Sequence, residues 1–129
     1  MKGSNYNMKE TVSFTVGEKE YEIGYDIKSL MKFEQLSGRT LYSLFSGGSQ
    51  QSILNSFSLE ITVAGLSSGL NLSLDDTYDF IDNAIENGLL IDDLNGYIMQ
   101  AMLKANGFLK RKEKEEVKTE KPKTSKKKK

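Results

Sequence analysis

The chain has 129 residues with 18 Lys and Arg, 18 Asp and Glu, one Pro and no His, Cys or Trp, a composition typical of a small soluble single-domain protein. Without His or Cys it has no imidazole base, no thiolate nucleophile, no disulfide and none of the usual ligand sets for zinc, copper or iron. No segment has the roughly 18 consecutive apolar residues of a membrane-spanning helix, and the first residues are not an apolar signal core, so we expect a cytoplasmic protein that is not an enzyme and needs no cofactor, metal or membrane.

The first predicted element is a β-hairpin. Polar and apolar residues alternate with period two from Thr11 to Val16 and again from Glu20 to Tyr25, on either side of a turn at residues 17–19. The apolar positions share one face and are Val12, Phe14, Val16, Tyr21, Ile23 and, as the next position of the pattern, Tyr25. An isolated hairpin is marginally stable in water, so the segments that follow are expected to cover this face.

A helix is predicted directly after the hairpin. Asp26 is a suitable N-cap, and Gly38 supplies the end of the helix. Its apolar positions recur three and four residues apart and are Ile27, Leu30, Met31 and Phe33. This spacing predicts that these four side chains face the core.

A short helical segment is predicted to begin at Thr40 and to be broken by Gly47–Gly48. It carries several large apolar side chains within a few residues, which favours either incomplete burial or membership of the core. The four residues, which we take as candidates for contact with a client protein, are Leu41, Tyr42, Leu44 and Phe45.

Residues 50–67 fit one further helical stripe, although the β-branched pair Thr62 and Val63 weakens the pattern. The apolar positions of this stripe are Ile53, Leu54, Phe57, Ile61, Ala64 and Leu66. Gly65 and Gly69 have no membrane-spanning segment around them, and we interpret them as helix punctuation.

The next helix is predicted to start at Ser73, which has an acidic residue, Asp76, at the third position of a capping box. Its apolar face is predicted to consist of Tyr78, Ile81, Ala84 and Ile85. The opposite face carries acidic residues at spacings of four, three and four, namely Asp75, Asp79, Asp82 and Glu86. A solvated outer face, a divalent-cation site and a docking strip for a basic partner or for the chain's own tail are three interpretations of this set.

A last helix is predicted from about Leu90 to Ala105, ending at Asn106–Gly107. Its stripe consists of Ile91, Leu94, Ile98, Ala101, Met102 and Ala105. Two interpretations apply to the methionines and their apolar neighbours, which are plain core packing and an adaptable apolar binding surface. The residues concerned are Met31, Met99, Met102, Phe108 and Leu109.

The zero net charge hides a division of the chain. Residues 1–109 carry 7 Lys and Arg against 14 Asp and Glu, whereas residues 110–129 carry 11 against 4 and have a single aliphatic side chain, Val117. The latter segment cannot bury enough apolar surface to offset its ordering entropy. We therefore expect a flexible N-terminus at 1–10, one α+β domain at 11–109 in which the hairpin packs on four to five helices, and a disordered Lys-rich tail at 110–129.

This order of elements resembles the phage tail assembly chaperones that are encoded beside the tape-measure gene in gene transfer agents and long-tailed phages. The most specific part is the turn Ser37-Gly38-Arg39-Thr40-Leu41 after a helix that carries Phe33-Glu34, and the acidic helix opening at residues 72–76 and the terminal helix are also similar. The resemblance covers residues 11–109. It rests on a pattern of elements rather than on an active-site signature.

The resemblance implies a non-enzymatic assembly factor that binds the tape-measure protein, keeps it soluble, self-associates on it and helps to recruit tail-tube subunits. Such a protein acts in the host cytoplasm and is not part of the mature virion. Family members are commonly made in two lengths by a −1 ribosomal frameshift. The codons of Lys126, Lys127, Lys128 and Lys129 are a candidate frameshift region, because Lys codons form A-rich runs.

The Lys-rich tail also allows readings that do not depend on this resemblance. A solvated charge run is one, and binding to a nucleic acid or another anionic surface is another, since basic tails neutralise phosphates without a fold. The tail has no aromatic residue, so base stacking is not supported and nucleic acid is the less favoured partner. A small nucleic-acid-binding or regulatory protein acting through the tail is the alternative function.

Overall fold

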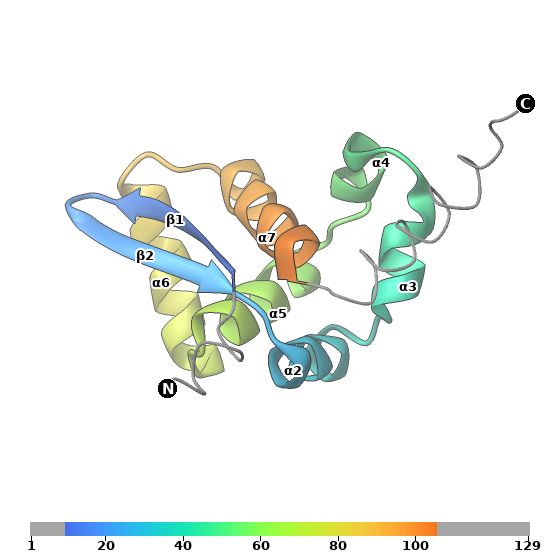
Figure 1. Ribbon diagram of the computed structural model, residues 1–129. Coiled ribbons are helices and arrows are strands. Elements are labelled where there is room, and N and C mark those ends of the chain that lie inside the picture. Colours follow the sequence, from blue (N-terminus) through green and yellow to red (C-terminus); the bar gives the residue numbers. More distant parts are fainter. Residues whose placement is uncertain (1–9, 106–129) are drawn as a thin grey trace, which may run out of the picture.

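A two-stranded antiparallel hairpin followed by six α-helices makes up residues 10–105, the part of the chain that the computed structural model describes (Figure 1). This confirms the predicted α+β class. The elements are β1 (Thr11–Val16), β2 (Lys19–Gly24), α2 (Ile27–Ser37), α3 (Leu41–Leu44), the 3-10 turn η1 (Phe45–Gly47), α4 (Gln50–Asn55), α5 (Leu59–Leu70), α6 (Leu74–Glu86) and α7 (Ile91–Ala105). Residues 1–9 of the expected N-terminus, 106–109 of the expected domain, with Phe108 and Leu109, and the whole expected tail lie outside the described part, as does the candidate frameshift region.

The hairpin forms with the predicted apolar face, but Lys19, which the sequence pattern places in the turn, is the first residue of β2 and pairs with Val16. Phe14 pairs with Tyr21 and Val12 with Ile23, so the apolar residues share one face. The two-residue turn begins with Gly17 at φ 63°, a left-handed conformation that glycine adopts without steric cost. The cover comes from α6 and α7, because the ring of Phe14 stacks on Tyr97 with centroids 4.5 Å apart and meets the edge of Phe80 at 6.2 Å.

Helix α5 passes through the middle of the fold, with α7 and β2 against one side (Figure 1). Two glycines make this close approach feasible. A Cβ atom at Gly65 would lie 2.9 Å from Cγ2 of Ile98 in α7, and one at Gly69 would lie 2.6 Å from Cγ1 of Ile23 in β2. Both residues lie inside α5 as packing contacts, so their interpretation as helix punctuation is wrong.

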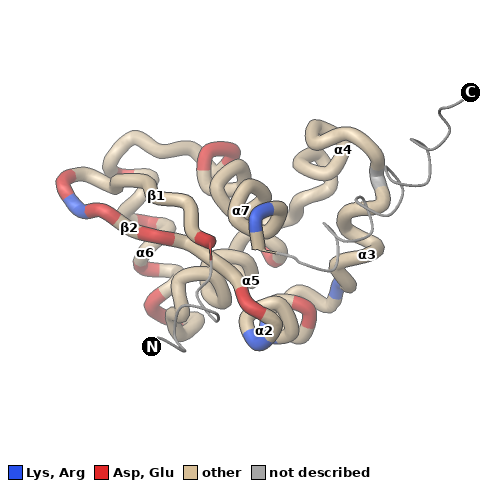
Figure 2. The backbone as a smooth tube through the Cα atoms, viewed as in Figure 1, with Lys and Arg blue, Asp and Glu red and all other residues tan. Residues whose placement is uncertain are grey.

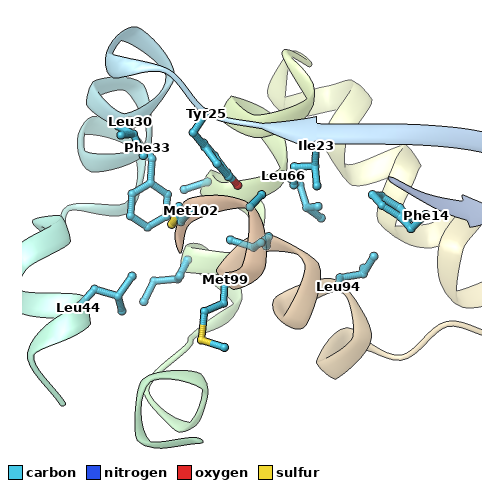
Figure 3. Close-up of a cluster of buried hydrophobic side chains, with 14 of the residues drawn as sticks. Phe14, Ile23, Tyr25, Leu30, Phe33, Leu44, Leu66, Leu94, Met99 and Met102 are labelled. Carbon is cyan, nitrogen blue, oxygen red and sulfur yellow. The ribbon is translucent and has the colours of Figure 1, made fainter. Parts of the chain in front are cut away.

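The core gathers where α2, α5, α7 and the end of β2 meet, and Figure 3 shows Tyr25, Phe33, Leu66 and Met102 pointing into it. The Tyr25 hydroxyl donates a hydrogen bond of 2.7 Å to the Gly65 carbonyl. Complete burial of this phenol raises its pKa well above the ordinary value, because the charged form would lose its hydration. Tyr25 is therefore a core residue with one satisfied polar atom.

The predicted helix over residues 50–67 is two helices. Helix α4 ends at Asn55, and α5 starts only after Ser58, whose hydroxyl accepts a hydrogen bond of 3.2 Å from the Ile61 amide. Ser56 ends the first helix and donates 2.7 Å to the Ile53 carbonyl. Serine competes well for backbone groups at helix ends, and two such residues separate α4 from α5.

The buried face of α6 matches the predicted one only in part, because Ala84 is buried and Ile81 packs against the core as predicted. Thr77, Phe80 and Ala84 are buried, whereas Tyr78 and Ile85 are each 49 % exposed. Both stripes recur at helical spacing, so the apolar period alone does not distinguish them.

In α2 the observed buried face again differs in part from the predicted one, whereas in α7 the two faces agree. Leu30 and Phe33 of α2 are buried as predicted, but Ile27 and Met31 are exposed. In α7 the central residues of the predicted stripe are buried, and Met99 joins them. Met99 and Met102 therefore pack in the core, which is the first of the two interpretations given for them.

Candidate protein-binding groove

The four residues of the short helical segment do not form one surface. Leu41 and Leu44 are 4 % and 2 % exposed and belong to the core, and Phe45 packs partly against it. Tyr42 is 60 % exposed. The four predicted client-contact residues therefore do not share one exposed surface. For Leu41 and Leu44, the alternative prediction of membership of the core is correct.

The turn that carries the family resemblance has a physical explanation. Gly38 ends α2 at φ 73° and donates its N–H to the Glu34 carbonyl at 2.9 Å. The Glu34 carboxylate reaches past it and accepts 2.8 Å from the amide of Leu41, and the Thr40 hydroxyl accepts from Ser43. These residues satisfy the free amides at the start of α3 and fix its direction after α2, which is a structural role.

An apolar groove of about 360 Å³ lies between the end of α2 and the beginnings of α5 and α6. Leu36 comes from α2, and Leu74 and Tyr78 come from α6. Helix α5 contributes the rest of the lining, which is Leu59, Glu60, Val63 and Ala64. Leu59 is 68 % exposed, the highest fraction among the exposed large apolar side chains of the described residues.

The groove lies on the face of α5 away from the hairpin and α7. Val63 is two residues from Gly65, which places it on the opposite side of the helix from the glycine that contacts Ile98. Helix α5 therefore meets the groove only along its first half, at Leu59, Glu60, Val63 and Ala64, while all of residues 64–69 are buried.

Acidic residues border the groove. Glu60 lines it, and Asp75, Asp79 and Asp82 lie beside the Leu74–Tyr78 side of α6, all of them exposed. No Lys or Arg is among the residues that line it. Residues 10–105 as a whole carry 5 Lys and Arg against 14 Asp and Glu, and Figure 2 shows the acids along β2, on α6 and at the start of α7. The surroundings of the groove are thus electronegative.

A second hollow of about 480 Å³ lies where α2 begins, and its lining is mostly polar. Two of its polar residues form a capping box, in which Asp26 accepts a hydrogen bond of 2.9 Å from the amide of Ser29 and one of 2.6 Å from its hydroxyl. This arrangement caps the start of α2, which is a structural role.

The described residues hold no cluster of three or more acidic side chains placed to bind a metal ion. The acidic set of α6 is exposed throughout, as a solvated outer face would be. No helix between residues 10 and 105 has the length and apolar character to cross a membrane.

Sequence reasoning did not find the groove, although one signal was present. Leu59 and Leu74 each follow a serine N-cap and occupy the first position of a helix. Leu74 precedes the predicted stripe of its helix, and Leu59 lies between Phe57 and Ile61 but is not part of the predicted stripe. Comparison of this chain with protein-family models, with curated proteins and with solved structures gives no match.

Proposed function

We propose that this chain is a phage tail assembly chaperone without enzymatic activity, which binds the tape-measure protein through the apolar groove, keeps it soluble and helps to recruit tail-tube subunits. The groove between α2, α5 and α6 is the observation that carries the proposal. The agreement of the hairpin and helices with the resemblance supports it further. The place of action is the host cytoplasm, and the protein is absent from the mature virion.

The mechanism is mass action on a client that aggregates. A long client exposes apolar stripes until its tail partners cover them, and a chaperone that covers them first favours the soluble state. The groove suits this task, because Leu59, Leu74 and Tyr78 expose contiguous apolar surface at one place on the molecule. Copies of the chain that self-associate along the client would extend the protection.

Co-expression tests this function. The resemblance implies a tape-measure protein encoded beside this gene, which is the candidate client, and its soluble fraction is measured with and without this chain. We expect a several-fold increase in soluble client and its co-purification with the chaperone. An equally insoluble client in both cultures would refute the proposal.

A matched pair of variants connects the function to the groove. Leu59 and Ile27 are the first residues of their helices and are 68 % and 63 % exposed, but only Leu59 lines the groove. Glutamate is favourable at the start of a helix, so both Leu59→Glu and Ile27→Glu should fold. We expect Leu59→Glu to lose most of the soluble client and Ile27→Glu to retain it.

The nucleotide sequence offers a separate test of the two-product arrangement. An unbroken A-run at the codons of Lys126, Lys127, Lys128 and Lys129, followed by a long open −1 frame, would support a second, longer product. Mixed Lys codons with no overlapping frame would remove that part of the proposal and leave client binding untouched.

A further inference from the structure

Helix α6 presents three stripes along its length. One is buried in the core, a second is apolar and about half exposed, and a third is acidic and exposed. The members of the first are Thr77, Phe80 and Ala84, those of the second Leu74, Tyr78 and Ile85, and those of the third Asp75, Asp79, Asp82 and Glu86. At 3.6 residues per turn the apolar stripe lies between the core and the acids. The groove wall is therefore apolar with an acidic outer border.

The groove has the form that a helix fills. Its lining residues are one helical turn apart, Leu59 and Val63 on α5 and Leu74 and Tyr78 on α6, so they form two ridges with a furrow between them. Leu36 of α2 lines the groove from a third helix. An amphipathic helix places its apolar side chains into such a furrow at the same one-turn spacing.

We propose that the groove binds an amphipathic α-helix of the client whose apolar stripe is bordered by Lys and Arg, an inference that rests on the proposed function and names the chemistry of its contact segment. The basic residues would face Glu60 at one end and Asp75 and Asp79 along the outer border. Charge complementarity at a rim accelerates association and selects among helices of equal apolarity. The chain's own residues 110–129 are basic but hold one aliphatic residue, Val117, so they lack the apolar stripe.

Three labelled synthetic peptides of about 18 residues, roughly 27 Å of helix, probe the full-length chain by fluorescence anisotropy. The first has a leucine stripe bordered by lysines, the second has the same stripe bordered by glutamates, and the third has the composition of the first with the leucines scattered. We expect the first to bind at least tenfold more tightly than the other two. Equal affinity for the first and second, or for the first and third, would overturn the proposal.

The matched variants separate docking in the groove from general attraction to an acidic protein. Both Leu59→Glu and Ile27→Glu add one negative charge at the start of a helix. Non-specific attraction predicts slightly tighter binding of the lysine peptide to both variants. Docking in the groove predicts at least tenfold weaker binding of the lysine peptide to Leu59→Glu and no loss of binding to Ile27→Glu. Slightly tighter binding of the lysine peptide to both variants would overturn the proposal.

The acidic border is tested by the double variant Asp75→Asn and Asp79→Asn. The double variant should bind the lysine peptide several-fold more weakly, with a smaller salt dependence of the affinity. Its affinity for the glutamate peptide should not decrease. Sedimentation at the same concentrations tests for a second copy in the groove. A homodimer that Leu59→Glu dissociates would assign the groove to that copy and overturn the proposal.

The peptide assay and the co-expression assay fail independently. If the neighbouring client is made soluble but the peptides are not distinguished, the chaperone function stands and this inference falls. If the lysine peptide binds in the groove but the client remains insoluble, the groove chemistry stands and the proposed chaperone function falls.

Discussion

At the scale of single residues, two glycines in α5 determine how closely the layers of the fold approach. Gly69 lies against the side chains of Ile23 and Tyr25, and the Tyr25 hydroxyl reaches the carbonyl of Gly65 one turn earlier. Glycine in a helix costs roughly 0.5–1 kcal/mol relative to alanine, so its use here offsets a larger steric cost. This steric cost arises wherever an added Cβ atom would overlap a neighbouring element.

The substitutions Gly69→Ala and Gly96→Ala should therefore have opposite effects. A Cβ at Gly69 would lie 2.6 Å from Ile23 and 2.7 Å from the Tyr25 hydroxyl oxygen, and such overpacking costs about 1–3 kcal/mol. Gly96 is also inside a helix, but nothing lies within 4 Å of its added Cβ, so alanine should stabilise by up to about 1 kcal/mol. Urea unfolding of both variants measures this difference, and equal shifts would contradict the packing described for α5.

Such residues show where prediction from sequence stops. A glycine within an apolar helical stripe can mark an end or a close contact, and only the neighbouring element distinguishes the two. Gly38 and Gly48 have positive φ and do end or break helices, as predicted. Gly65 carries the same local signal, but Ile98, 33 residues later, decides its role.

At the scale of elements, α6 has more apolar residues than its contact with the core uses. The ring of Phe80 meets Phe14 at 6.2 Å and Tyr21 at 5.0 Å, so the hairpin selects the face that includes Phe80. Tyr78 and Ile85 then remain half exposed on the neighbouring stripe. Of this surplus, Tyr78 lines the groove together with Leu74.

Alanine substitutions in α6 test this rotation directly. Phe80→Ala removes a side chain that is 7 % exposed and should cost about 3–5 kcal/mol of the free energy of unfolding. Ile85→Ala removes one that is 49 % exposed and should cost no more than about 1 kcal/mol. Both changes introduce alanine into the same helix, so the gain in helix propensity is similar. The reverse order in denaturant titrations would show that the predicted face, with Tyr78 and Ile85, is the buried one.

The elements that could be predicted are those with a single interpretation. The hairpin alternates with period two around a Gly turn, and α7 has one apolar stripe through Leu94, Ile98 and Met102, so both form as expected. The junction of α4 and α5 could not be predicted, because the apolar pattern continues through Ser56 and Ser58. The helical hydrogen bonds are interrupted there, and both serine hydroxyls bond to backbone groups instead. The groove could not be predicted either, since it needs the relative placement of three helices.

At the scale of the whole molecule, the described residues are acidic and the remaining C-terminal sequence is basic. Within residues 10–105 there are 5 Lys and Arg against 14 Asp and Glu, whereas residues 110–129 hold 11 against 4. Acidic surfaces repel the phosphates of nucleic acids. The alternative function in nucleic-acid binding therefore depends on the basic segment alone, and the proposed chaperone function depends on the groove.

Replacing Lys126, Lys127, Lys128 and Lys129 by Gln distinguishes these functions. If the groove binds the client, the variant should keep the neighbouring protein as soluble as the unmodified chain does, while Leu59→Glu abolishes that solubility. If the basic segment acts on duplex DNA, the slope of log affinity against log salt should fall by as much as about 3.6, the contribution of four phosphate contacts. Loss of client solubility in the lysine variant, together with full solubility in Leu59→Glu, would transfer the function from the groove to the basic segment.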